Sequence, residues 1–298
     1  MRVILQLIGC LAPFTLVHSA EEHDSAGWET ILDEKLTQWE IFLGPPHVSV
    51  VVPGYTHAAD PKQDKPLGLN SDPLHVFTVR AIGGEPVLHI TGEIFGTITT
   101  LKEYGDFHLR VQFRWGAVKH APRLNAPRDN GILYRCFGPQ GATGGFWKRS
   151  LECQVQENDI GDLYSLGGTA GIAALEFPNP RGGKPLWHYV PGAPLRRFGG
   201  RCAHGEDYHE LPNGEWNTIE IMAVGDRSLH ILNGRVVNVL QNTQRAVDGR
   251  TQALVSGQIQ IQSEGAEAEY RRLEIRPLVR FPSEYQALFA PAASPTAK

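Results

Sequence analysis

Residues 131–157, GILYRCFGPQGATGGFWKRSLECQVQE, hold the pattern that decides the fold. Two segments in which apolar and polar residues alternate, 131–137 and 150–157, flank a glycine-rich loop, as expected of two antiparallel strands. Asn233-Gly234 separates two more such segments and favours a type I′ hairpin turn, in which both central residues need a positive φ. Further alternating segments lie at 95–101, 106–115, 217–224, 257–263 and 268–278. The sequence therefore predicts an all-β fold, a two-sheet antiparallel β-sandwich with long loops.

The length and composition fit one domain of this kind. The chain has 298 residues, 41% of them hydrophobic, with 32 Gly and 21 Pro, which is enough for a core and many turns. We expect a single β-sandwich domain over 21–282, with proline- and glycine-rich loops at 44–76 and 178–212, and a disordered tail at 283–298. The formal net charge is −4 and no basic stripe is present, so nucleic acid is not an expected partner.

The first twenty residues have the features of a secretory signal. Arg2 precedes an apolar run that ends near Ala20, and the run is too short to span a membrane after processing. We expect a signal peptide at 1–20 and export to the periplasm or the extracellular space. Leu7-Ile8-Gly9-Cys10 offers an alternative, lipidation at Cys10. No later segment is long and apolar enough to span a membrane.

The remaining cysteines do not form a recognisable framework. Three cysteines follow the first twenty residues, Cys136, Cys153 and Cys202, and an odd number cannot all form disulfides within the chain. Their spacing matches no zinc-binding motif. We interpret them as buried thiols or at most one disulfide.

Segment 150–157 carries the first candidate site residues. If Cys136 lies opposite Cys153, then Arg135 lies opposite Gln154, and alternation sends Arg135, Glu152 and Gln154 to one face. Cys153 and Val155 then point into the core. A charged, amide-bearing face in the middle of a large sheet fits a sugar-binding concavity, and a plain solvated face fits as well.

The spacing of Glu152, Gln154 and Glu157 is that of the E-x-D-x-x-E strand of a large class of glycoside-cleaving enzymes, with an amide in the middle. Retaining glycosidases hold their two carboxyls about 5–5.5 Å apart. Glu157 reaches the face of Glu152 only if a β-bulge lies near Gln156. The sequence permits this pair without favouring it.

Other candidates are weaker. His230 leaves the more apolar face of its segment and is either structural or a proton carrier, which we expect within about 10 Å of Glu152. Trp147 could stack on a sugar ring or belong to the core. No organic cofactor is evident, but Asp129, Glu157 and Asp162 could hold a divalent cation through oxygen ligands.

An ordered set of segments carries a family resemblance. GWETILDEKLTQWE, TLKEYGDFHLRVQFRWG, DNGILYR, LECQVQENDIGDLY, GEWNTIEI, HILNGRVV and GQIQIQSEGAEAEYRRLEIRPL together resemble the 3-keto-disaccharide hydrolase domain family, also described as 3-keto-glucoside lyase/hydratase. The resemblance runs from about Gly27 to Leu278. It implies the jelly-roll fold of concanavalin A-like lectins and glucanases. It also implies removal of the C2 proton of a 3-keto-glucoside, loss of the C1 substituent and addition of water.

The resemblance extends to individual positions. Arg135, Glu152, Gln154, Glu157 and His230 match polar motif positions, whereas Glu264 in Gln262-Ser263-Glu264-Gly265 replaces the histidine of a Q-x-H-G segment found in many members. The candidate catalytic residues are therefore Glu152, Glu157 and His230. The candidate substrate-binding residues are Arg135, Gln154, Asp162, Trp147, Gln262 and Glu264.

Three functions remain open for a carbohydrate partner. The first is an exported enzyme that cleaves 3-keto-glycosides by elimination and hydration. The second is a retaining glucan hydrolase that uses Glu152 and Glu157. The third is a non-catalytic, lectin-like carbohydrate-binding module.

Overall fold

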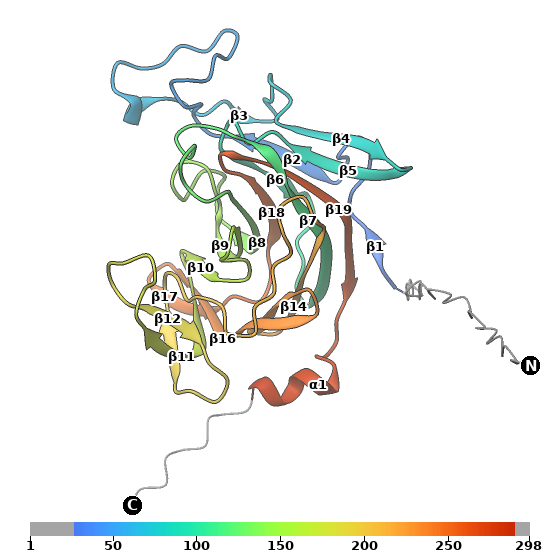
Figure 1. Ribbon diagram of the computed structural model, residues 1–298, viewed down its shortest axis with the longest axis vertical. Helices are drawn as coiled ribbons and strands as arrows, with labels where there is room; N and C mark the ends of the chain where they lie inside the picture. The colour runs from blue at the N-terminus through green and yellow to red at the C-terminus, as the bar shows by residue number, and fades with distance from the viewer. Residues whose placement is uncertain (1–26, 290–298) are drawn as a thin grey trace, which may run out of the picture.

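The computed structural model describes residues 27–289 and confirms the predicted fold class: an all-β chain with two antiparallel sheets in layers (Figure 1). In these residues the smaller sheet has seven strands in the order β10-β9-β8-β18-β6-β2-β3. Its strands are β2 (Trp39–Leu43), β3 (Gly68–Leu69), β6 (Gly96–Thr100), β8 (Asp129–Phe137), β9 (Arg149–Gln156), β10 (Leu163–Leu166) and β18 (Gln258–Ser263).

The larger sheet has twelve strands among the same residues, with the main order β12-β11-β16-β15-β14-β7-β19-β5-β4. These are β12 (Leu186–Tyr189), β11 (Gly168–Phe177), β16 (Arg235–Val247), β15 (Arg227–Leu232), β14 (Asn217–Val224), β7 (Phe107–Lys119), β19 (Ala266–Pro277), β5 (Glu85–Ile90) and β4 (Phe77–Ile82). At its sides, β1 (Glu29–Thr30) pairs with β19, β13 (Leu195–Phe198) with β11, and β17 (Arg250–Ala253) with β16.

The core lies between the two sheets. Leu151, Cys153 and Val155 of β9 are completely buried there, as the alternation predicted. Every second residue of β7 from Phe107 to Trp115 belongs to the same apolar cluster. Burial of one face of each sheet therefore fixes which β9 side chains point outward.

The predicted hairpin turn is confirmed. Asn233 and Gly234 join β15 to β16 and have φ values of 48° and 78°, so both central residues have the positive φ of a type I′ turn.

The pairing of β8 with β9 differs from the prediction. Cys153 lies opposite Ile132 rather than Cys136, and Glu152 lies opposite Leu133. The register then shifts between Tyr134 and Phe137, where Arg135 has a φ of 53°. The condition for Glu157 to reach the face of Glu152, a bulge near Gln156, is not met, because the pairing is regular from Leu151 to Gln156 and the irregularity is in the partner strand.

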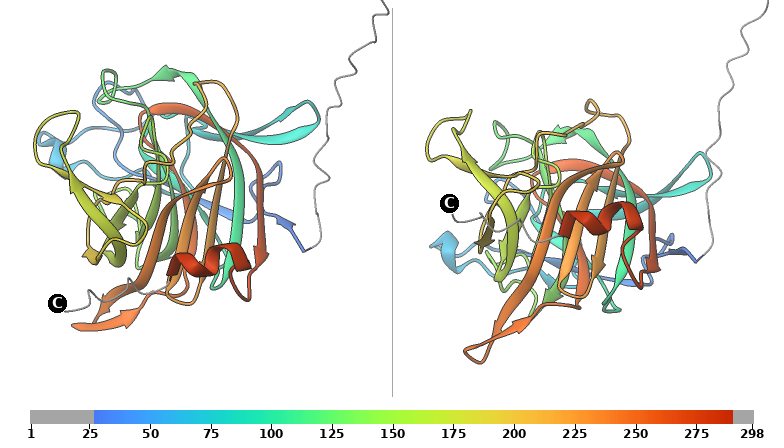
Figure 2. Two further views of the ribbon diagram at one scale, coloured as in Figure 1. Left: turned by 60° about the horizontal axis from the view of Figure 1, so that its bottom comes forward. Right: turned by 90° about the horizontal axis from the view of Figure 1, so that it is seen from below.

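The described chain continues past residue 282, the expected end of the domain. The helical turns are η1 (Pro61–Gln63), α1 (Ser283–Gln286) and η2 (Ala287–Phe289). Figure 2 shows α1 lying against strands of the twelve-stranded sheet, and the Phe289 ring lies 5.4 Å from the Arg227 guanidinium.

The proposed signal peptide, Cys10 and residues from 290 onward lie outside the described residues. Between residues 27 and 289 no helix is long and apolar enough to cross a membrane.

The three described cysteines have the predicted character of buried thiols. Cys136, Cys153 and Cys202 are all free and buried.

Candidate functional site

The outer face of the seven-stranded sheet, the face away from the core, is lined mainly by polar residues. Opposite residues on paired strands share a face, and Glu152 lies on the side away from the core. We call this surface the polar face. Its two central rows are Tyr164–Glu152–Leu133–Gln260–Thr99 and Gln154–Gly131–Gln262–Thr97.

Gly131 has no side chain in the middle of the polar face, and we call the space above its backbone, which the ends of Glu152 and Gln262 occupy, the dent. A Cβ atom added to Gly131 would lie 2.0 Å from Glu152 Oε1 and 2.4 Å from Gln262 Oε1. The two side chains therefore converge over the backbone of β8, in the space that any other residue would fill. Only glycine permits this arrangement, because atoms at such distances overlap.

Two more carboxyl groups lie beside Glu152. Asp129 is the first residue of β8, and Glu264 directly follows β18, two residues beyond Gln262. Arg123 connects them: its Nη2 lies 2.5 Å from Asp129 Oδ2 and its Nη1 3.8 Å from Glu264 Oε1. We call Glu152, Asp129 and Glu264, together with Arg123, the acid cluster.

The three carboxyl groups hold their protons more tightly than free carboxyls do. Burial raises the pKa of Glu152 well above its ordinary value, and the charges of Glu264 and Asp129 raise it further. Burial raises the pKa of Glu264 to about 7 although Arg123 lowers it. Burial and the charge of Glu264 raise the pKa of Asp129 to about 8, again against Arg123. Near neutral pH the acid cluster therefore contains both protonated and ionised carboxyls.

Several buried polar atoms of this region have no hydrogen-bond partner. Asp129 Oδ1, Gln262 Oε1 and Arg123 Nε are of this kind. Buried polar groups are normally satisfied, and a concentration of unsatisfied ones is a reason to look for a polar ligand. Glu152 is 4% exposed and the Glu264 side chain is 18% exposed, so Glu264 is the member with more access to solvent.

Aromatic rings border the acid cluster. Phe95 directly precedes β6, next to the pair formed by Gly96 and Ser263, and so lies beside Glu264 on the adjoining strand. Phe95 and Trp147 stack with their ring centroids 6.3 Å apart, and Phe146 lies 5.4 Å from each of them. Trp147 also packs against Leu133 of the polar face. Acids next to aromatic surface suit a sugar ring, which has polar edges and apolar faces.

The structure thus brings Glu152, Gln154, Gln262, Glu264 and Trp147 to the polar face. Glu157 is not among them. It lies beyond the end of β9, where its carboxylate accepts hydrogen bonds from Arg128 Nη1 at 2.6 Å and Asn213 Nδ2 at 2.7 Å. Although partial burial opposes it, these bonds and that of the Arg128 backbone N–H keep the pKa of Glu157 below its ordinary value.

The expected position of His230 is wrong. His230 belongs to β15 of the twelve-stranded sheet, whereas Glu152 lies on the outer face of the other sheet. The imidazole is completely buried, with Nδ1 2.8 Å from Gly161 O and Nε2 3.0 Å from Tyr134 Oη. Burial lowers the pKa of His230 to about 4, so it is neutral. The prediction failed because both faces of β15 are buried, so the alternation of residues along this strand does not indicate which face points to a site.

The prediction that Arg135 shares a face with Glu152 and Gln154 is also wrong. The positive φ of this residue turns its side chain to the core, where Nη1 donates to Thr243 Oγ1 and Leu254 O, each at 2.8 Å. Asp162 is completely buried and accepts hydrogen bonds from Arg201 Nε and His204 N, both at 2.7 Å. Arg135 and Asp162 therefore make hydrogen bonds between segments of the fold, and their side chains do not point toward the acid cluster.

The proposed cation ligands do not come together. Asp129 pairs with Arg123, Glu157 with Arg128 and Asp162 with Arg201. Within residues 27–289 no three His, Cys, Asp or Glu side chains are grouped so that they could hold a metal ion.

Sequence reasoning missed Arg123, Gly131 and Phe95, and treated Asp129 only as a cation ligand. The one local signal was Asp129-Asn130-Gly131, an acid and a glycine in an otherwise apolar segment. The other two residues are brought to the site by tertiary contacts.

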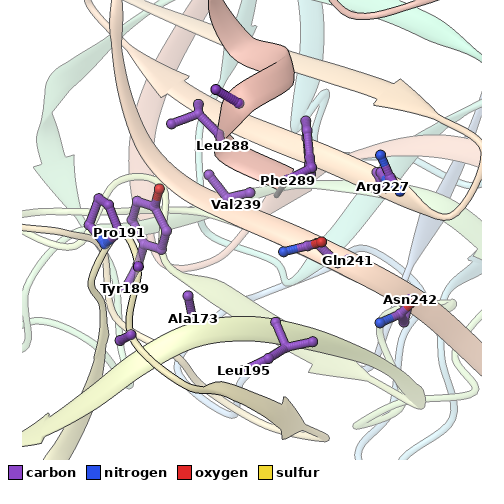
Figure 3. A pocket seen from close by; sticks show the side chains of 13 residues that line it. Ala173, Tyr189, Pro191, Leu195, Arg227, Val239, Gln241, Asn242, Leu288 and Phe289 are labelled. Carbon is purple, nitrogen blue, oxygen red and sulfur yellow. The ribbon is translucent and has the colours of Figure 1, made fainter. Parts of the chain in front are cut away.

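A separate cavity of about 620 Å³ lies on the twelve-stranded sheet. Leu288 and Phe289 of η2 line it opposite Ala173 and Leu195 (Figure 3). Its charged lining residue is Arg227, and it contains no carboxyl or imidazole group for proton transfer. For this reason we place the candidate site at the acid cluster.

A β-sandwich that buries acids beside aromatic rings on one sheet face has the features of a carbohydrate-active protein. The chain belongs to the 3-keto-alpha-glucoside-1,2-lyase-like domain family, whose model matches residues 27–276. This confirms the resemblance found in the sequence and makes the chain a member of a glycosyl-hydrolase-like, carbohydrate-active family.

Similar solved structures include a "putative glycosyl hydrolase" from Parabacteroides distasonis, 16% identical, with a TM-score of 0.45 over 84% of this chain and 99% of that one. A β-glucanase from Bacillus licheniformis is 10% identical, with a TM-score of 0.38 over 84% and 97%. The carbohydrate binding module CBM66 from Bacillus subtilis is 10% identical, with a TM-score of 0.37 over 67% and 91%. No curated protein matches the sequence.

Proposed function

We propose that this protein cleaves 3-keto-glycosides by removing the C2 proton, expelling the group at C1 and then adding water, with net hydrolysis as the result. The acid cluster is the observation that carries the proposal. Three carboxyl groups lie together there, two of them paired with Arg123, and their raised pKa values supply a proton acceptor and a proton donor at the same pH.

The elimination step needs a base, a donor and a stabiliser of negative charge. The ketone at C3 makes the C2 proton acidic, and we assign its removal to the Glu264 carboxylate, whose pKa of about 7 lies nearest neutrality. Glu152, which burial keeps protonated, gives its proton to the oxygen leaving C1. The Nε–H of Arg123, which has no partner in the fold, can donate to the developing enolate oxygen.

The hydration step reverses these roles. The C1–O bond has broken and a C1–C2 double bond conjugated to the ketone has formed. Glu152, now ionised, accepts a proton from water as the water oxygen bonds to C1. Glu264 returns its proton to C2, and both carboxyls end in their starting states. The cycle needs no oxidant, reductant or covalent enzyme intermediate.

The retaining mechanism fits the geometry less well. Glu152 and Glu157 are separated by five residues of extended chain, roughly 16 Å along the strand, against the 5–5.5 Å that the mechanism requires. Glu157 is also held by Arg128 and Asn213, so its carboxylate is already engaged. For the enzyme we propose export as well, on the basis of the signal-like residues 1–20.

The test uses methyl 3-keto-α-glucoside beside methyl α-glucoside, with the reaction run in D₂O and followed by NMR. We expect turnover of the keto sugar alone, with deuterium appearing at C2. Hydrolysis of unoxidised glucosides would instead support the retaining glycosidase, and binding without turnover would support the lectin-like module.

Three isosteric variants sharpen this test. Glu152→Gln and Glu264→Gln should each lower kcat on the keto sugar by about 100-fold or more, the usual contribution of a general acid or base. Glu157→Gln, just beyond the end of β9, is the matched control. Equal losses in all three variants would contradict the assignment to the acid cluster.

A further inference from the structure

A hollow of about 800 Å³ opens beside the polar face, between the 44–67 segment and the glycine-rich loop at 138–148. Its walls are mainly apolar and come from rings: Phe42, Pro45, Pro46, Pro66 and Phe146 all line it. We call it the proline hollow. The residues that enclose it come from the chain between β2 and β3 and from the loop between β8 and β9.

The proline hollow lies next to the candidate site. The Phe146 ring lines the hollow and also lies 5.4 Å from Phe95, which borders the acid cluster. Phe42 lies opposite Thr97, and Thr97 lies opposite Gln262. Phe42 is thus two strands from Gln262, or about 10 Å, a separation that a substituent on a sugar bound at Gly131 can cover.

The chemistry of the hollow favours an apolar ring over a second sugar. Proline and phenyl rings offer flat hydrocarbon surface. The polar groups nearby are already engaged: Gln140 Nε2 donates to Glu40 Oε1 at 2.9 Å, and Asp64 accepts from Ala58 N at 2.6 Å and contacts His57. A sugar there would lose its hydration without gaining partners, which costs free energy. Lys62, at the exposed rim, is the charged lining residue that remains.

We propose that the proline hollow is the subsite for the group attached to C1, and that it selects glycosides with a flat aromatic aglycone. This inference rests on the proposed cleavage of 3-keto-glycosides. The Phe146 ring forms the wall between the aglycone and the reacting sugar. Gly44 leaves room for that ring, since a Cβ at Gly44 would lie 2.2 Å from Phe146 Cδ1.

The experiment compares benzyl and methyl 3-keto-α-glucosides, whose leaving alcohols have similar acidity. We expect kcat/KM to favour the benzyl compound by about tenfold, the contribution of a good aromatic contact. Phe146→Ala and Pro46→Ala should both reduce this preference. Val51→Ala is the matched control, because Val51 belongs to the same segment, is 87% exposed and does not line the hollow.

Calorimetry with the unoxidised benzyl and methyl α-glucosides separates this inference from the function on which it rests. Tighter binding of the benzyl compound, lost in Phe146→Ala, supports the subsite even if no keto sugar is turned over. Turnover of both keto sugars with equal kcat/KM, together with equal binding of the unoxidised pair, would overturn the subsite and leave the cleavage reaction standing. Loss of the preference in Val51→Ala to the same extent would also overturn it.

Discussion

The substitution Gly131→Ala tests the candidate site without replacing a titratable residue. The new methyl group would lie 2.0 Å from Glu152 Oε1 and 2.4 Å from Gln262 Oε1, both well inside contact distance. The backbone φ of Gly131 is not positive, so alanine itself is not strained there. The ends of two side chains must therefore move away from the dent.

The expected magnitudes separate activity from stability. Overpacking costs about 1–3 kcal/mol, and replacing glycine by alanine returns about 0.4–1 kcal/mol through the unfolded state. The free energy of unfolding should fall by no more than about 2.6 kcal/mol. A displacement of about 1 Å at a catalytic carboxyl is enough to lower kcat/KM by roughly 100-fold.

Gly116→Ala is the matched control. Gly116 lies on β7, and its added Cβ would meet the Glu267 carboxylate at 2.4 Å, the same kind of clash on the other sheet. Elimination is followed by the absorbance of the conjugated enone product, and stability by thermal unfolding. Wild-type kcat/KM in Gly131→Ala would refute a role for the dent, and equal losses in both variants would show that the effect is not local.

The remaining predictions concern pH and the covalent state of the enzyme. Activity should rise as Glu264 ionises near pH 7 and fall at higher pH, where Glu152 loses the proton that it donates. Because Arg123 lowers the pKa values of Glu264 and Asp129, the rising limb of the Arg123→Gln pH–rate profile should move to higher pH, and an unmoved limb would argue against the pairing. His230→Ala should lower the free energy of unfolding by about 2–4 kcal/mol and leave kcat/KM per folded molecule unchanged. The pKa of His230 is lowered to about 4, so its stabilisation is present above pH 6.5 and lost as the pH falls toward 4. Chemical denaturation across that range should show a weaker pH dependence in the variant. Mass spectrometry after a slow, activated glucoside should show no added sugar, and an adduct on Glu152 would restore the retaining mechanism.

Much of the fold follows from local pattern. Alternation along β9 predicted Cys153 and Val155 in the core and Glu152 and Gln154 outside, because one buried face is enough to orient a strand. The positive φ values at Asn233 and Gly234 follow from the residues themselves.

Register could not be predicted in the same way. The β8 and β9 pairing is displaced by four residues from the expected one, an even number that leaves Glu152 on the predicted face. The bulge between Tyr134 and Phe137 then reverses Arg135. Its cause is tertiary, since the terminal nitrogens of the buried guanidinium donate to Thr243 and to two carbonyl groups of distant segments.

The sequence predicted single members of the acid cluster but not the cluster itself. Glu152 and Glu264 were candidates, but their proximity depends on the order β9-β8-β18, which joins residues more than a hundred positions apart. Arg123 comes from the loop after β7, for which the sequence gives no periodic signal. Convergence of this kind depends on long-range pairing, which local propensity does not encode.

Glu264 stands where the family resemblance led us to expect a histidine, and the site gives a physical interpretation of this difference. A neutral imidazole that gains a proton changes charge from 0 to +1, with an ordinary pKa near 6.5. Glu264 beside Arg123 makes the same change: the ion pair has no net charge, and protonation of the carboxyl leaves +1. Burial raises the pKa of Glu264 to about 7, so the change occurs in the same pH range. A glutamate alone would instead alternate between −1 and 0 beside two other acids. Arg123 is therefore what allows a carboxyl to occupy this position, and the shift of the Arg123→Gln pH–rate profile measures that contribution directly.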